Sequence, residues 1–272
     1  RPLYLVAVNP GVRTARHSAG ATMLVLKADD PLAVSATEAV QTGDLDTLRS
    51  LLAEHPGLAT AFIGDHPDGM SRTLLHAATD WPGQYPNNVA TVRALLEAGA
   101  DVDARFTGPH TETPLHWTAS SNDVEVMDVL LDAGADIEAR GAVIAGGTPL
   151  ADATAFGQWD AARRLVERGA RSNLFESAAL GLLDRVEAEL AAEPPPDPEY
   201  VNGAFWGACH GGQLATAQRL LAAGADISWV APWDGLTPLD AARRSASDGV
   251  ATWQEVADWL VAQGARPADE VT

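Results

Sequence analysis

Cysteine, lysine and long apolar runs are nearly absent from this chain of 272 residues. Its single cysteine, Cys209, excludes an intramolecular disulfide and is typical of a protein in a reducing compartment. The apolar run near the N-terminus covers residues 3–8, far fewer than the roughly 20 residues of a spanning helix, and it is also too short for a secretory signal. We therefore expect a cytoplasmic protein that neither spans a membrane nor is secreted.

Positive charge is also scarce. The chain has 18 Lys and Arg against 37 Asp and Glu, which gives a net charge of −19, and Lys27 is its one lysine. A charge of this sign repels phosphate backbones and anionic lipid headgroups, so nucleic acids and membranes are poor partners, whereas a basic protein would be attracted. Hydrophobic residues make up 46% of the chain, which is enough for a buried core.

What the chain has in abundance is internal repetition. The run at 95–105 recurs at 130–140, with Gly99 and Gly134 lying 35 residues apart, and a period of this length indicates a repeat architecture. Related copies of the Leu-Leu-x-x-Gly-Ala run lie at 165–171, 220–227 and 260–266. A second signature of the type Thr-Pro-Leu-His starts at Thr73, Thr113, Thr148 and Thr237.

Both signatures predict helix ends. Thr caps a helix start, Pro suits the first helical position and Leu faces a core, so each tetrad predicts the beginning of a short helix. The Leu-Leu-x-x-Gly run predicts the end of a second helix, because glycine enters the left-handed conformation at no steric cost. Turn residues such as Asn122 and Asp123 lie between the two. Each repeat is therefore expected to be a pair of antiparallel helices followed by a loop.

Residues 106–139 read almost as the consensus of the ankyrin repeat, and the chain resembles that family over residues 34–266. The resemblance implies an all-α ankyrin-repeat solenoid of about seven helix-turn-helix units, with residues 1–33 outside the repeats as a cap, hairpin or tail and residues 267–272 as a C-terminal tail. The expected units are 34–62, 68–104, 107–139, 143–172, 174–192, 202–229 and 232–266.

Four segments depart from the repeat pattern. Residues 81–88 and 247–253 are insertions that lengthen the second and last units, and the proline-rich residues 193–198 predict a stiff extended bridge. Residues 1–33 contain two strand-like runs, at 3–8 and 22–26, without any repeat pattern.

No pattern of residues in the sequence indicates a catalysed reaction. His76 and His116 occupy the same place in two tetrads, where we expect each imidazole to bridge its own threonine hydroxyl and neighbouring backbone rather than to bind a metal. Cys209 takes an alanine position and is expected to be buried and inert. We therefore predict no enzyme activity, no catalytic residue, no metal and no cofactor.

Eight tryptophans are more than packing requires, and Trp81, Trp229, Trp233 and Trp253 lie in insertions or loops, where we expect them to be exposed, whereas Trp117 and Trp259 are expected to pack. The resemblance implies a monomeric interaction module whose protein partner, expected to be basic, binds on the loops before the tetrads and in the concave groove. An alternative is a small-molecule-binding protein or enzyme with an aromatic pocket in that groove, lined by Trp81, Phe156, Trp206 and His210. The predicted partner-binding residues are Met70, Arg72, Asp80, Trp81, His110, Glu112, Ser120, Ser121, Ile144, Phe156, His210, Trp233, Asp234 and Arg244.

Overall fold

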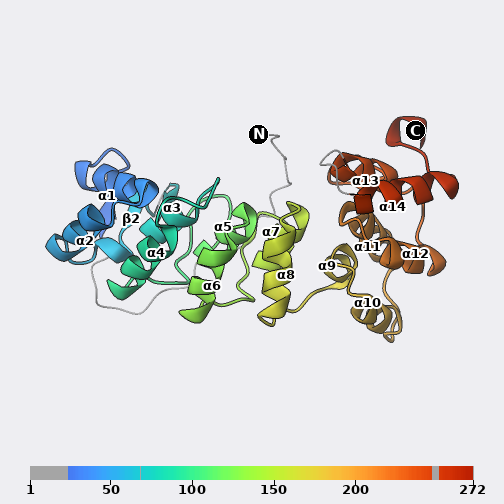
Figure 1. The fold of residues 1–272 in the computed structure, drawn as a ribbon, viewed down its shortest axis with the longest axis horizontal. Helices are drawn as coiled ribbons and strands as arrows, with labels where there is room; N and C mark the ends of the chain where they lie inside the picture. Colours follow the sequence, from blue (N-terminus) through green and yellow to red (C-terminus); the bar gives the residue numbers. More distant parts are fainter. Residues whose placement is uncertain (1–23, 68, 247–250, 272) are drawn as a thin grey trace. The chain divides into compact units, whose positions relative to one another are not determined.

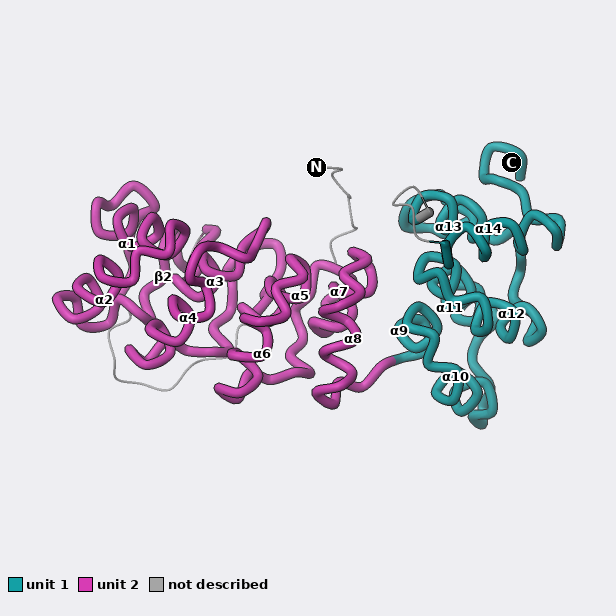
Figure 2. Tube along the Cα trace, in the orientation of Figure 1, with its two compact units in different colours: residues 1–21, 173–272 teal, residues 22–172 magenta. Residues whose placement is uncertain are grey.

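The computed structural model of the chain describes residues 24–67, 69–246 and 251–271. The chain divides into two compact units, which we name the N-terminal unit (residues 22–172, magenta in Figure 2) and the C-terminal unit (residues 173–272, teal). Both are built mainly from pairs of helices, as the repeat pattern predicts. No helix in the described ranges combines the length and apolar character needed to cross a bilayer.

Four helix pairs are described in the N-terminal unit (Figure 1). The first helices of successive pairs contact one another in order, and so do the second helices, so that the pairs stack as two layers. Each tetrad starts a first helix, as expected: Pro114 and Pro149 are the first residues of theirs. The pairs are α1 (Pro31–Thr42) with α2 (Leu45–Glu54), α3 (Leu74–Thr79) with α4 (Asn88–Glu97), α5 (Pro114–Ser121) with α6 (Val124–Asp132), and α7 (Pro149–Ala155) with α8 (Trp159–Glu167).

A small sheet, which the repeat pattern does not predict, accompanies the first two pairs. Strand β1 (Val25–Leu26) lies parallel to β2 (Phe62–Gly64), and β2 is antiparallel to β3 (Ser71–Arg72), with Ile63 opposite Arg72. The short 3-10 helix η1 (Leu58–Thr60) leads into β2. Strand β1 falls within the strand-like run predicted at 22–26, whereas the run at 3–8 lies outside the described residues.

Three further helix pairs are described in the C-terminal unit. Here too the first helices contact one another in chain order, as do the second helices. The segment 193–198 leads directly into the first turn of α11, where the Asp197 side chain accepts a hydrogen bond from the backbone N–H of Glu199. The elements are α9 (Leu174–Ala179) with α10 (Leu183–Leu190), α11 (Pro198–His210) with α12 (Leu214–Ala222), α13 (Pro238–Ala246) with α14 (Ala251–Ala262), and the short α15 (Ala268–Val271).

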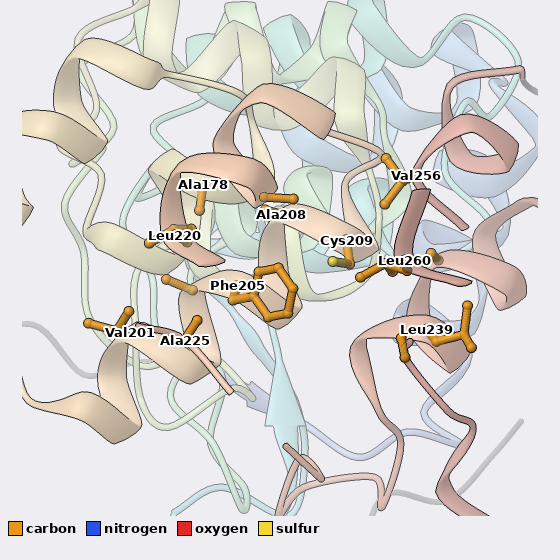
Figure 3. Close-up of a cluster of buried hydrophobic side chains, with 14 of the residues drawn as sticks. Ala178, Val201, Phe205, Ala208, Cys209, Leu220, Ala225, Leu239, Val256 and Leu260 are labelled. Carbon is orange, nitrogen blue, oxygen red and sulfur yellow. The ribbon is translucent and has the colours of Figure 1, made fainter. Parts of the chain in front are cut away.

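The core of the C-terminal unit is made of apolar side chains from every helix pair (Figure 3). Phe205 is its largest fully buried residue, and Leu220 and Leu260 come from the second helices. Cys209 lies in the same core, as predicted, and burial raises the pKa of its thiol. An inert, protonated thiol follows from this position.

The tetrad histidines connect neighbouring repeats. His76 Nδ1 accepts a hydrogen bond from the backbone N–H of Thr73 at 3.3 Å and lies 3.0 Å from its hydroxyl, while Nε2 lies 3.1 Å from the carbonyl oxygen of Glu112 in the next repeat. His116 repeats this arrangement with Thr113 and with the carbonyl oxygen of Gly147. The predicted structural role of both histidines is confirmed, and each imidazole ties the start of its own helix to the following loop.

Carboxylates replace the histidine in two other repeats. In α9, Glu176 and Asn173 exchange side-chain-to-backbone hydrogen bonds across the helix start. In α13, Asp240 Oδ2 accepts hydrogen bonds from Thr237 N at 3.1 Å and from Ala268 N at 2.8 Å, and so reaches the last turn of the chain. A carboxylate can accept several hydrogen bonds at once, which is why it can replace the imidazole as a brace.

Candidate partner-binding surfaces

Aromatic rings gather on the first helices of the C-terminal unit. Phe175 in α9, Trp206 in α11, and Trp229 and Trp233 in the loop before α13 form a group that we name the aromatic cluster. The rings of Trp206 and Trp233 meet edge to face with centroids 5.2 Å apart, and those of Trp229 and Trp233 lie 5.3 Å apart. Phe175 stacks on Trp206 at 6.3 Å. Edge-to-face and stacked contacts of this kind fix the orientation of each ring.

Exposure differs strongly within the aromatic cluster. Trp206 is 3% exposed, whereas Trp233 is 49% exposed. The indole nitrogen of Trp229 donates a hydrogen bond to Glu199 Oε2 at 2.8 Å, which holds the Trp229 ring in addition to its contact with Trp233. Trp233 is therefore a solvent-facing ring on a rigid aromatic base.

Charged groups border the aromatic cluster. The guanidinium of Arg244 lies over the Trp206 ring, 5.7 Å from its centroid, and its Nη1 lies 3.2 Å from Asp234 Oδ2. His210 contacts the Trp206 ring at 5.1 Å. The structure thus brings together four residues that the sequence predicts as partner-binding, Trp233, Asp234, Arg244 and His210. Phe175 belongs to this cluster but was not among the predicted partner-binding residues. The sequence signal that could have identified it is its position on the first helix of a predicted pair.

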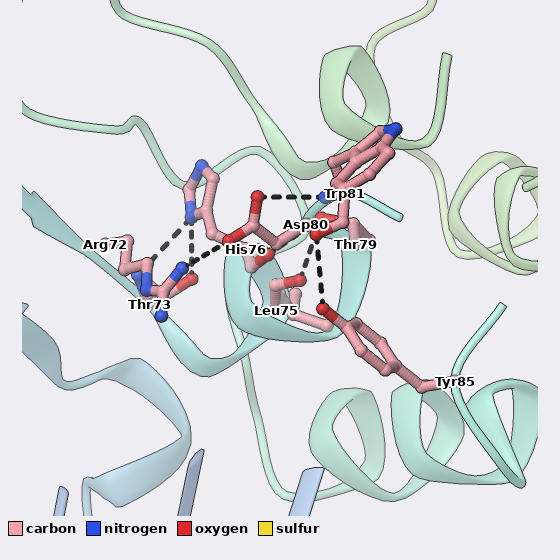
Figure 4. Close-up of polar contacts among 8 residues, drawn as sticks. All are labelled: Arg72, Thr73, Leu75, His76, Thr79, Asp80, Trp81 and Tyr85. Carbon is pink, nitrogen blue, oxygen red and sulfur yellow. Dashed lines mark hydrogen bonds and ion pairs between the residues drawn. The ribbon is translucent and has the colours of Figure 1, made fainter. Parts of the chain in front are cut away.

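A second group of predicted residues lies where α3 ends in the N-terminal unit (Figure 4). Arg72 Nη1 and Asp80 Oδ2 form an ion pair at 2.6 Å, and Asp80 Oδ1 accepts a hydrogen bond from the backbone N–H of Trp81 at 2.9 Å. Trp81 is 73% exposed and Met70 is 64% exposed. The group thus contains two exposed apolar side chains, Met70 and Trp81, and an ion pair that orders the backbone where α3 ends.

Burial argues against direct partner contact for three predicted residues. Glu112, Ser121 and His210 are each only 7% exposed, and Ser121 donates its hydroxyl hydrogen bond to the carbonyl oxygen of Trp117 in its own helix. Ser120 is half-buried and bonds to the carbonyl oxygen of His116 in the same way. Phe156 is exposed, whereas His110 and Ile144 are half-buried.

Trp253 corrects another expectation. It lies in the first turn of α14 rather than in an exposed insertion, it is half-buried, and its indole nitrogen donates to the carbonyl oxygen of His210 at 2.7 Å. Residues 247–250 of that predicted insertion lie outside the described residues, whereas 251–253 belong to α14. Trp229 is also half-buried, while Trp117 and Trp259 pack as expected.

Two carboxyl groups, those of Glu112 and Asp152, are buried in the N-terminal unit. Glu112 is bonded to the Trp117 side chain, and burial, together with the charge of Asp80, raises the pKa of Glu112 to about 7. Asp152 in α7 is fully buried and accepts a hydrogen bond from the backbone N–H of Ile144 at 3.3 Å. Burial and the charge of Glu112 raise the pKa of Asp152 well above its ordinary range. Ionising either group therefore costs free energy in the folded state.

Glu112→Gln is expected to stabilise the chain at alkaline pH. The folded pKa of about 7 lies above the ordinary value of 4.5, so the folded state binds more protons and the stability from Glu112 is lost as pH rises from 4.5 through 7. Glutamine keeps an acceptor for Trp117 without the charge. We expect a gain on the order of 1–2 kcal/mol at about pH 8 and little change at about pH 4.5, measured by urea unfolding. An equal effect at both values would contradict the burial argument.

Within the described ranges, no three His, Cys, Asp or Glu side chains lie close enough together to hold a metal ion. The fully buried histidines at the tetrads act as braces, and burial lowers the pKa of both His76 and His116 to about 4.

Comparison with known families gives two matches. A model described as ankyrin repeat matches residues 71–106, and a model described as ankyrin repeats in three copies matches residues 103–176. No protein of curated function matches the sequence. The matched segments include α3 to α8, with the histidine braces and with Arg72, Asp80 and Trp81 of the second group. Ankyrin repeats are in general protein–protein interaction modules and are typically not enzymes.

Proposed function

This chain contains ankyrin repeats, and on that premise we propose that it is a non-enzymatic module that binds a basic protein through exposed aromatic side chains. The observation that carries the proposal is the aromatic cluster, in which the half-exposed Trp233 packs on the buried ring of Trp206 and the half-buried rings of Phe175 and Trp229. Binding energy at protein interfaces concentrates on large aromatic side chains in well-packed surroundings.

Preorganisation supports this role for the aromatic cluster. The Trp233 ring contacts three other rings of the cluster, and the Arg244 guanidinium packs over one of them, Trp206. The surface that a partner would contact is therefore already ordered. A rigid surface loses little conformational entropy on binding, which favours affinity. In the N-terminal unit, Trp81 and Met70 are the corresponding exposed apolar side chains, and the ion pair of Arg72 with Asp80 orders the helix end beside them.

The charge of the chain supports a basic partner. With a net charge of −19, the chain attracts positively charged proteins and accelerates their association at low ionic strength. We extend the proposal to a protein acting in the cytoplasm, because its single cysteine is buried and forms no disulfide, and we propose that it acts as a monomer. The side chain of Asp234 is 7% exposed, so this residue is not among the proposed contacts. The proposed contact residues are those of the predicted set that keep exposed or half-exposed side chains: Met70, Arg72, Asp80, Trp81, His110, Ser120, Ile144, Phe156, Trp233 and Arg244.

Trp233→Ala and Trp81→Ala are expected to weaken partner binding while leaving the fold intact. Removing an exposed aromatic anchor should weaken binding at least about tenfold, which is about 1.4 kcal/mol. The partner is first captured from native lysate with the full chain and identified by mass spectrometry, and its affinity for each variant is then measured by calorimetry. Trp159→Ala, a half-buried tryptophan on the second helix α8, is the matched control and should bind normally.

Two results would count against the proposal. If Trp233→Ala lowered the melting temperature strongly, the ring would be part of the core rather than a contact surface. If both variants stayed folded and bound the partner with unchanged affinity, the interface would lie away from both groups of residues. Capture of an acidic partner would refute the proposal that the partner is basic, but not the proposal that it binds through the exposed aromatic side chains.

A further inference from the structure

The Trp233 ring stands nearly perpendicular to its neighbours in the aromatic cluster. Its plane is inclined by 84° to the Phe175 ring and by 86° to the Trp206 ring, with centroids 6.3 and 5.2 Å away. The far end of the indole lies against α11 at Gly203, where an added Cβ would be 3.8 Å from the Cη2 atom of Trp233. Because only this part of the ring is covered, about half of the side chain stays exposed as an ordered aromatic surface.

A carboxylate lies on the same side of α11 as this ring. Glu199 precedes Gly203 by four residues, so the two lie on one face of the helix, one turn apart. Glu199 Oε2 accepts the indole hydrogen bond of Trp229 at 2.8 Å, and the Trp229 and Trp233 rings have their centroids 5.3 Å apart. Glu199 is exposed and forms no ion pair with any residue in the described ranges. Its second oxygen, Oε1, is therefore available to a hydrogen-bond donor from outside the chain.

The aromatic cluster already holds one guanidinium between a ring and a carboxylate. Arg244 lies over the Trp206 ring, 5.7 Å from its centroid, and its Nη1 lies 3.2 Å from Asp234 Oδ2. The face of an indole attracts positive charge, and a carboxylate accepts the guanidinium hydrogen bonds, so the two groups hold this cation together. Trp233 and Glu199 are a second set of the same two kinds of group. Among the described residues, no lysine or arginine pairs with Glu199 or lies over the Trp233 ring.

We infer that Trp229, Trp233 and Glu199 bind an arginine side chain of the protein partner, and we name these three residues the arginine site. The inference rests on the protein-binding function proposed above and adds which side chain is recognised. A guanidinium is planar and can stack on an indole while its edge pairs with a carboxylate, whereas a lysine ammonium is a strongly hydrated point charge. An apolar side chain would leave Glu199 without a counter-ion, and an acidic one would be repelled by Glu199 and by the net charge of −19.

The first measurement is a nuclear magnetic resonance titration of the full chain with capped Gly-X-Gly peptides, in which X is arginine, lysine or citrulline. Citrulline keeps the planar shape of arginine without its charge. At about 150 mM salt, which screens long-range attraction, the arginine peptide should shift the indole N–H signals of Trp229 and Trp233 at a concentration at least about threefold lower than the lysine peptide. The citrulline peptide should cause no shift at that concentration. Equal shifts by the arginine peptide and either of the other two, or no shift by any of them, would overturn the inference.

Glu199→Gln tests the carboxylate while leaving the rings in place, because glutamine still presents an oxygen to the indole N–H of Trp229. This variant should bind the arginine peptide at least about threefold more weakly, since it loses the ion pair. Glu255→Gln makes the same change of charge at an exposed position of α14 and is the matched control, which should bind the peptide normally. Equal weakening by the two variants would mean that only the overall charge of the chain attracts the peptide, and it would overturn the arginine site.

The same variants separate this inference from the proposed function once the partner is identified. Glu199→Gln should weaken partner binding at least about threefold, and Glu255→Gln should not. A partner whose affinity falls with Trp233→Ala but not with Glu199→Gln would overturn the arginine contact and leave the protein-binding function standing. If the arginine peptide bound selectively but the partner bound Trp233→Ala with unchanged affinity, the arginine site would stand and its use in the proposed function would be refuted.

Discussion

Replacing Leu130 by alanine is expected to lower the free energy of unfolding by about 2–5 kcal/mol, because the change leaves a cavity in a packed core. Leu130 lies in α6 and is fully buried, as are Val126 and Met127 in the same helix. The α6 helix contacts both α4 and α8, so a cavity here weakens two neighbours. Urea unfolding followed by circular dichroism measures the effect.

Leu131→Ala is the matched control for this experiment. The repeat pattern alone makes the two leucines of the Leu-Leu pair equivalent, but Leu131 is only half-buried. We expect a distinctly smaller loss for Leu131→Ala. Equal losses at the two positions would mean that both side chains are equally enclosed, contrary to the structure.

Between pH 4 and pH 6.5 the tetrad histidines are expected to add stability, against the loss of stability from the buried carboxyl groups of Glu112 and Asp152 over the same interval. Burial lowers the pKa of His76 and His116 to about 4, whereas the unfolded value is 6.5, so the unfolded state binds more protons over this interval. Each histidine contributes on the order of 3 kcal/mol to the difference between the two ends of the interval. Above about pH 8 both are neutral in both states and their contribution is constant.

His116→Gln isolates the effect of one brace. At about pH 7.5 the loss of the bonds to Thr113 and Gly147 should cost about 1–3 kcal/mol. Towards about pH 4.5 the cost should shrink, because glutamine carries no proton that burial must remove. Melting temperatures of both proteins across this range give the comparison. A cost that did not change with pH would contradict burial of a neutral imidazole.

The helix pairs could be predicted from the sequence because their signals are local. A tetrad such as that at Thr113 and a terminator such as Gly134 each act within a few residues, and the structure places the corresponding helix ends where expected. The same locality explains why the sheet was missed. Strands β1 and β2 contain only two and three residues, and they pair across the whole first helix pair.

The binding surfaces were predicted less completely because they depend on contacts between distant residues. The insertion at 81–88 was visible as a change of spacing, but the hydrogen bond that holds it, from Gln84 to Asp123 in the next repeat, was not. Similarly, Phe175 gains its significance only from stacking on Trp206. The sequence pattern of one repeat does not show which side chains of the next repeat will contact that repeat.

The histidine braces make the two ends of the N-terminal unit different, because each brace runs from one repeat to the repeat that follows it. Each imidazole belongs to one repeat but has its acceptor in the repeat that follows, as with His76 and Glu112 or His116 and Gly147. Deleting repeats from the start of this unit leaves every remaining brace with both of its ends. Deleting repeats from the other end removes the acceptor of the last histidine together with the repeat that covers it. Shortened chains made from opposite ends are therefore not equivalent, even when they keep the same number of repeats.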